Sequence, residues 1–353
     1  MTENSEPRIL VIRSGAIGDT LMATPLIRSL RDSFPGAYIG AVTSGPAADV
    51  LRHNPNVDDV YPIVLRHLPI WLSKAKMDIL AAAKRFRIDT VLSLESNPVF
   101  TALAMSTTAG RVVTYDPLAS GPRVSLVSAV DGEHSIERHI RAGESVGAMS
   151  SGTDMDLFYP VEADESVTVK LAAAGIRRED RVVGIHAGWG RDKQDPVDTR
   201  LRSWPGKRFG QLAAWLSNEI GAKVVLTGSK RDRQLDDYIT RESDVDCYNS
   251  AGELSFTESA ALIRRMAVYI TVDSGPAHMA AAIGTPLVTL WGPGIYTATR
   301  PLSNKGRVEI LRDPPPCAPC YGTPLLKTCR DNICMKQIGL DQVKDAVLSM
   351  VTV

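Results

Sequence analysis

Short runs of β-branched and aliphatic residues alternate with longer segments of helical periodicity through almost the whole chain. The strand-like runs form two series, at residues 8–13, 37–42, 60–64 and 90–94, and at residues 181–186, 222–227, 268–272 and 286–291. Helical patterns lie between them, at residues 20–34, 69–86, 165–175, 206–220, 230–242, 257–266 and 274–283. This alternation is typical of parallel βαβ units, in which helices cover both faces of a sheet. We therefore predict an α/β protein with doubly wound parallel sheets.

The length of 353 residues indicates two domains, because one domain usually holds about 100–200 residues. A polar interval without periodicity, residues 154–164, separates the two series. We predict an N-terminal Rossmann-like domain over residues 1–165, a C-terminal one over residues 178–335 and a final helix within residues 336–353. Open α/β sheets bind ligands at the carboxyl ends of their strands, so we expect a cleft between the two domains.

The charges exclude one broad class of function. Lys plus Arg and Asp plus Glu both number 40, so the formal net charge is zero and argues against a dedicated nucleic-acid-binding protein. The polar first residues lack the apolar core of a signal peptide, and no run of about 18 apolar residues occurs. We expect a cytoplasmic protein.

The loop of residues 14–20 follows the first strand and precedes a helix. It contains Gly15 and Gly18 but not the G-x-G-x-x-G fingerprint, which disfavours a dinucleotide-dependent oxidoreductase. A glycine-rich turn before a helix allows close approach of the backbone to a ligand. Asp19 has two interpretations: a carboxylate favoured by the start of the helix, or a general base at the cleft edge.

A second candidate segment, residues 273–278, lies between a strand and an Ala-rich helix. Pro276 suits a first helical turn, and Asp273 or Ser274 is expected to cap it. The exposed N–H groups would then suit a diphosphate, with His278 on the same rim. The alternative is an ordinary capped helix with a partly buried histidine.

Two further turns follow strands. One runs from His186 to Gly190 and leads through a charged loop to Arg202, and the other is Gly228-Ser229-Lys230. A loop of nearly 20 residues in a compact domain is more often functional than idle. Together the four turns fit a polyanionic ligand better than any one of them does alone.

The set of motifs, in this order, resembles glycosyltransferase family 9, the ADP-heptose:lipopolysaccharide heptosyltransferases. The resemblance covers almost the whole chain. Its anchors are Ser14–Asp19 with Thr24–Arg31, His186-Ala-Gly188, Trp204-Pro205, Thr227-Gly-Ser229 and Asp273–His278.

This resemblance implies a GT-B fold and an inverting transferase that needs no metal and no cofactor. It implies that Asp19 is the catalytic base, which deprotonates the acceptor hydroxyl. The expected donor-binding residues are His186, Arg202, Ser229, Lys230, Asp273, Ser274, Gly275 and His278. The family usually has Lys where this chain has Arg202, which keeps the charge and changes its geometry.

The implied partners are an ADP-heptose donor and a glycan or glycolipid acceptor. Among acceptors, the resemblance favours the lipopolysaccharide inner core. Such an acceptor lies at the cytoplasmic face of the inner membrane and would bring peripheral association with it. The expected acceptor-binding residues are Gly15, Gly18, Arg66 and Arg138. For each of the two arginines, the alternative interpretation is a solvated charge on the protein surface. The rival functions are transfer with another donor or acceptor, a nucleotide-sugar epimerase, and a non-catalytic sugar-nucleotide-binding protein.

Four of the five cysteines lie within residues 317–334, at Cys317, Cys320, Cys329 and Cys334. Four thiols could bind zinc, but only one half of this set has the C-x-x-C spacing. Disulfides are disfavoured in a reducing cytosol. We expect a structural role for the cluster.

Overall fold

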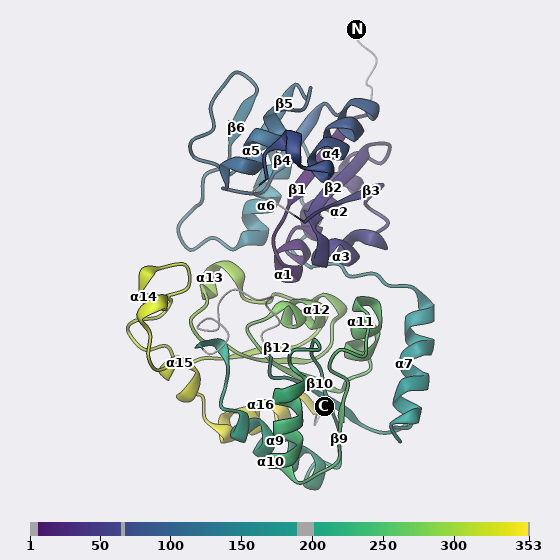
Figure 1. Ribbon diagram of the computed structural model, residues 1–353, viewed down its shortest axis with the longest axis vertical. Helices are drawn as coiled ribbons and strands as arrows, with labels where there is room; N and C mark the ends of the chain where they lie inside the picture. Colours follow the sequence, from purple (N-terminus) through teal and green to yellow (C-terminus); the bar gives the residue numbers. More distant parts are fainter. Residues whose placement is uncertain (1–5, 65–67, 189–200, 352–353) are drawn as a thin grey trace. The chain divides into compact units, whose positions relative to one another are not determined.

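A computed structural model describes residues 6–64, 68–188 and 201–351. The chain folds into two compact units, of which the first is Met1–Phe158 and the second is Tyr159–Val353. Each unit is built on its own parallel sheet (Figure 1).

The first unit has a six-stranded sheet in the order β3-β2-β1-β4-β5-β6. Its strands are β1 (Arg8–Arg13), β2 (Tyr38–Ser44), β3 (Asp59–Ile63), β4 (Thr90–Ser93), β5 (Arg111–Thr114) and β6 (Val124–Leu126). Its helices are α1 (Ile17–Leu21), α2 (Thr24–Ser33), α3 (Ala48–Arg52), α4 (Lys74–Arg85), α5 (Pro98–Met105) and α6 (Ser135–Glu144), with 3-10 turns η1 (Gly45–Ala47) and η2 (Ile70–Leu72). The strand order reverses between β1 and β4, and at such a point the loops after two strands diverge and leave room for a ligand.

The second unit repeats this plan in the order β12-β11-β10-β7-β8-β9. Its strands are β7 (Val182–His186), β8 (Lys223–Leu226), β9 (Cys247–Asn249), β10 (Val268–Val272), β11 (Leu287–Leu290) and β12 (Val308–Leu311). Its helices are α7 (Val161–Ala173), α9 (Gly206–Asn218), α10 (Arg233–Ser243), α11 (Phe256–Arg264), α12 (Gly275–Ile283), α13 (Tyr296–Thr299), α14 (Pro324–Thr328), α15 (Ile333–Lys336) and α16 (Leu340–Val351). The prediction of two doubly wound α/β domains is confirmed.

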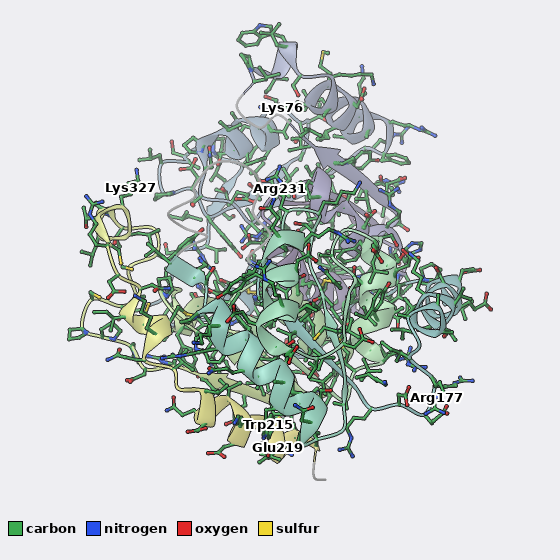
Figure 2. All side chains as sticks on the ribbon, turned by 60° about the horizontal axis from the view of Figure 1, so that its bottom comes forward. Lys76, Arg177, Trp215, Glu219, Arg231 and Lys327 are labelled. Carbon is green, nitrogen blue, oxygen red and sulfur yellow. The ribbon has the colours of Figure 1, made fainter. Side chains whose placement is uncertain are left out.

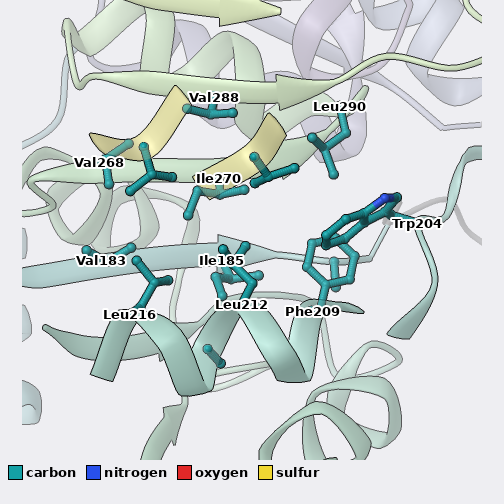
Figure 3. Packing of buried hydrophobic residues seen from close by; sticks show 14 of the residues in the cluster. Val183, Ile185, Trp204, Phe209, Leu212, Leu216, Val268, Ile270, Val288 and Leu290 are labelled. Atoms are coloured by element: carbon teal, nitrogen blue, oxygen red, sulfur yellow. The ribbon is translucent and has the colours of Figure 1, made fainter. Parts of the chain in front are cut away.

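One face of the second sheet packs on α9, as Figure 3 shows. Alternate residues of β7 and β10 point to this face and contact Phe209, Leu212 and Leu216. The ring of Trp204 meets Phe209 edge to face at 4.9 Å, and its Nε1 donates to the carbonyl of Ile338 at 2.9 Å. This core fixes the carboxyl ends of the central strands, where the candidate donor-binding loops begin.

The outer helices show where each unit ends. Helix α7 packs against α11 in the second unit, so that unit begins at Tyr159, whereas the predicted first domain extends to residue 165. The final helix α16 buries Val343 and Val347 in the core of the second unit. Within the described residues, no helix is both long and apolar enough to span a membrane.

Candidate functional site

Asp19 lies in α1, just after the carboxyl end of β1. Its Oδ1 accepts a hydrogen bond from Arg13 Nη2 at 2.6 Å, and its Oδ2 accepts one from the backbone N–H of Ala16 at 2.9 Å. The side chain is 30% exposed. These two bonds orient the carboxylate, a group that can accept up to about four hydrogen bonds.

Arg13 joins two carboxylates. Besides Asp19, its guanidinium lies 3.4 Å from Glu95 Oε1 and donates to the Leu94 carbonyl at 3.2 Å. Burial alone would lower the pKa of Arg13, but Asp19 and Glu95 outweigh it and the pKa is raised. Glu95 Oε1 also accepts from the Ser14 backbone N–H at 2.6 Å, so the loop after β1 is tied to the end of β4.

Gly15 is required by a close approach. A Cβ at this position would lie 2.4 Å from both Cβ and Oδ2 of Asp19, well inside contact distance. The carbonyl of Gly15 accepts a hydrogen bond from Ser44 Oγ at 2.7 Å. Gly18 is buried within α1. Gly15 therefore shapes the loop that leads to Asp19, and Gly18 lies in the helix that carries it.

The predicted acceptor-side cations have different outcomes. Arg138 places its guanidinium 3.9 Å from the centre of the Tyr115 ring, and it donates to the Val127 carbonyl at 2.7 Å through Nη2. Burial lowers the pKa of Arg138. Tyr115 in turn shares a 2.7 Å hydrogen bond with His139 Nδ1. Arg66 lies outside the described residues.

In the second unit, residues 273–278 cover the turn after β10 and the first turn of α12. Ser274 occupies the N-cap position with extended backbone, and Pro276 lies in the first turn. Ser274 is therefore the N-cap residue, one of the two expected, but its side chain makes no capping hydrogen bond. Ser274 Oγ instead shares a 3.0 Å hydrogen bond with Thr271 Oγ1, and the carboxylate of Asp273 is drawn to a cation.

That cation is Arg202. Its Nη1 lies 2.5 Å from Asp273 Oδ2, and both residues are buried. The other side of the guanidinium faces the Tyr321 ring at 4.2 Å. The structure therefore brings Arg202 to the predicted donor segment, where a carboxylate of the same segment offsets its charge.

His186, at the end of β7, lies beside Thr271 of β10 in the sheet register. Its Nδ1 is 2.7 Å from the Thr227 carbonyl, and because a carbonyl oxygen only accepts, Nδ1 carries the hydrogen. Burial lowers the pKa of His186, so the ring is neutral near pH 7 and Nε2 is an acceptor. His186 thus suits a hydroxyl or amino group better than a phosphate. His278 is buried in α12, two positions after Pro276.

Asp232 is a residue that the sequence reasoning missed. Its Oδ2 accepts from both the backbone N–H and the Oγ of Ser229, at 2.7 and 2.8 Å. A Cβ added to Gly188 or Gly228 would collide with the Asp232 side chain, so the turns after β7 and β8 close around it. The spacing Ser-x-x-Asp after a strand was the available signal, since a short acidic side chain often bonds a nearby turn. Lys230 is exposed on this turn, and residues 189–200 lie outside the described part.

No group of three or more His, Cys, Asp or Glu among the described residues is placed to hold a metal ion. All the cysteines are free thiols. Cys320 and Cys334 are buried, and burial is the main cause that raises the pKa of Cys334 to about 11. Burial also raises the pKa of Cys320, so Cys320 and Cys334 are protonated packing groups near pH 7.

Comparisons with known proteins point to one family. The model of glycosyltransferase family 9 (heptosyltransferase) matches residues 199–327. Lipopolysaccharide heptosyltransferase 2 of Escherichia coli K12 is 29% identical over 86% of this chain and 88% of its own. Lipopolysaccharide heptosyltransferase 3 of the same strain is 26% identical over 80% and 82%.

Solved structures agree on the fold. A family 9 glycosyltransferase from Veillonella parvula has a TM-score of 0.82 at 20% identity and covers 99% of both chains. The E. coli ADP-heptose heptosyltransferase II has a TM-score of 0.74 at 21% identity and covers 98% of both. With the ordered motifs and the two doubly wound units, these matches make the chain similar to glycosyltransferase family 9 over most of its length.

Proposed function

We propose that this glycosyltransferase moves a heptose from ADP-heptose to the inner core of a lipopolysaccharide precursor, with inversion at the anomeric carbon. The observation that carries the proposal is Asp19, a carboxylate held by Arg13 and the Ala16 N–H and still 30% exposed. The relatives named lipopolysaccharide heptosyltransferases support the choice of donor and acceptor. The acceptor places the reaction at the cytoplasmic face of the inner membrane.

The proposed chemistry assigns one task to each unit. In the first unit, Asp19 accepts the proton of the acceptor hydroxyl, whose oxygen attacks the anomeric carbon while the bond to the diphosphate breaks. Arg13 keeps the carboxylate oriented for that transfer, and Gly15, Gly18, Arg66 and Arg138 belong to the acceptor side.

In the second unit, the start of α12 with Ser274, Gly275 and His278 stabilises the departing diphosphate. Asp273 and Arg202 form one paired group beside it. We assign the neutral Nε2 of His186 to a hydroxyl or amino group of the donor. Ser229 and Lys230 complete the donor side at the turn that Asp232 fixes.

Nucleotide specificity tests this proposal. ADP-heptose and ADP should raise the melting temperature, because a ligand at 100 times its Kd stabilises by about 2.7 kcal/mol, or roughly 5–10 °C for a unit of this size. UDP- and GDP-sugars serve as controls in the same thermal-shift assay. A shift with UDP- or GDP-sugars alone would overturn the proposed donor. Conversion of the donor without any acceptor would instead favour the epimerase.

Gly15→Ala tests the close approach at the base. The added methyl group must displace Asp19, so we expect transfer to slow by about 10–100-fold, since small displacements of reacting groups have effects of this size. The matched control is Gly110→Ala, whose Cβ would meet its nearest neighbour at 3.9 Å. Steady-state kinetics should show slower transfer for Gly15→Ala than for Gly110→Ala. Equal rates would show that transfer does not depend on the position of Asp19 that Gly15 allows.

A further inference from the structure

The first unit has an exposed apolar surface, which is distant in sequence from the loop that holds Asp19. Trp71 and Leu72 of η2 are 75% and 63% exposed, and Met77 in the second turn of α4 is 46% exposed. We call these three residues the η2 ridge. Large apolar side chains that are adjacent and exposed usually mark a surface that another phase or molecule covers.

The fold holds the η2 ridge outward. The turn is closed by backbone hydrogen bonds from Leu72 to Pro69 and from Ser73 to Ile70, both 3.1 Å. Lys76 is buried, and its Nζ donates to the Leu68 carbonyl at 2.5 Å, which joins the segment before η2 to the first turn of α4 (Lys76 is labelled in Figure 2). These bonds keep Trp71 and Leu72 from folding back onto the unit.

The solvent face of α4 continues the η2 ridge with positive charge. Lys74, Lys84 and Arg85 are exposed on this helix, and Arg87 follows it. The exposed acidic residue of the helix, Asp78, pairs with Lys74 at 2.6 Å. At 1.5 Å per residue, Arg85 lies about 16 Å along the helix from Lys74, so Lys84 and Arg85 form a basic end of α4 opposite the end that adjoins η2.

We propose that the η2 ridge and the basic end of α4 bind the surface of an anionic lipid bilayer. Trp and Leu partition into the boundary between headgroups and acyl chains, and Lys and Arg attract anionic headgroups. A second copy of the chain is a poorer occupant, because a two-fold contact through this face would bring the cations of α4 toward each other. The inference rests on the proposed function in one respect: a lipid-anchored acceptor supplies the membrane.

Vesicle co-sedimentation tests the surface with the full chain and without donor or acceptor. The wild-type protein should bind vesicles of phosphatidylglycerol and phosphatidylcholine more than vesicles of phosphatidylcholine alone. The double variant W71S/L72S should bind at least ~10-fold more weakly, because it removes two buried apolar side chains from the bound state. K84E/R85E should lose the preference for phosphatidylglycerol. The matched control is Met149→Ser, which removes an equally exposed side chain (76%) from another part of the same unit.

Absence of wild-type binding, or equal binding of W71S/L72S, would overturn the inference. A monomer–dimer equilibrium that W71S/L72S abolishes in sedimentation velocity, without vesicle binding, would assign the ridge to a second copy. Transfer to a detergent-dispersed acceptor should be unchanged in W71S/L72S. If the wild type binds vesicles but transfers no heptose, the proposed function fails and the membrane surface stands.

Discussion

Replacement of Asp19 by Asn should slow glycosyl transfer by about 10²–10⁴-fold, the usual contribution of a general base. Asn retains the shape and can still accept the Ala16 N–H, but its amide cannot take the proton of the acceptor hydroxyl. Donor affinity should be unchanged, because the donor is assigned to the second unit. Rates from steady-state kinetics and donor Kd values from calorimetry measure the two quantities separately.

The matched control for this variant is Asp49→Asn. Asp49 also belongs to the first unit and accepts from an arginine, Arg52, at 2.9 Å, but the pair is an exposed one within helix α3. Exposed pairs of this kind contribute about 0–1 kcal/mol to stability, so this control should transfer at the wild-type rate. Near wild-type transfer by both Asp19→Asn and Asp19→Ala would show that another group is the base.

The sequence pattern predicts the central strands of both sheets and the edge strand β3, but it misses β5, β6, β9 and β12. The buried runs that become β1, β4, β7, β8, β10 and β11 are continuous and apolar, which is the pattern of strands covered on both faces. Strands β5, β6, β9 and β12 are three or four residues long, and β6 and β12 contain no buried residue. Strands β4, β8 and β11 are equally short, so what β6 and β12 lack is the buried apolar run that marks a strand covered on both faces.

The helices show the same limit at their ends. The periodicity over residues 69–86 predicts one helix, but the structure has η2 and then α4. Ser73 is responsible: its extended backbone and its side-chain bond to the Lys76 N–H start a new helix at residue 74. The capping preference of Ser was visible in the sequence, and the exposed ridge that precedes the cap was not.

Asp19 shows why the sequence can locate the candidate site but cannot predict the contacts within it. The two interpretations of its carboxylate do not exclude each other, because the structure has it accepting the Ala16 N–H at the start of α1 and facing Arg13 as well. The link from this loop to Glu95 spans 81 positions of the sequence, and the Arg202–Asp273 pair spans 71. Local spacing cannot predict pairs that only the sheet order brings together.

The second large expected effect is on the pH dependence of stability, and it arises from Asp236, a carboxyl group buried in the core of the second unit. It lies on the face of α10 that packs on the unit, is fully buried, and neither oxygen has a hydrogen-bond partner among the described residues. Burial raises its pKa to about 8; the carboxylates of Asp232 and Asp237 add to the shift and Arg233 opposes it. An unfolded Asp titrates at about 3.9, so between these values the folded protein holds a proton that the unfolded chain has released. The free energy of unfolding must therefore fall as the pH rises through this window, by up to about 1.4 kcal/mol per pH unit.

Asp236→Asn should remove that slope, because the amide stays neutral at every pH. We expect the variant to exceed the wild type in stability by about 1–3 kcal/mol at pH 8, the gain being limited by the hydrogen bonds that a buried amide requires. At pH 4, where both side chains are uncharged in the folded state, this gain should be gone, and the hydrogen bonds that the buried amide lacks should make the variant the less stable of the two. Urea unfolding at pH 4, 6 and 8 measures the effect, and Asp246→Asn, at an exposed position of the same unit, is the control. Parallel pH profiles for the wild type and Asp236→Asn would mean that the carboxylate ionises in the folded protein at little cost, and hence that water or a cation reaches it.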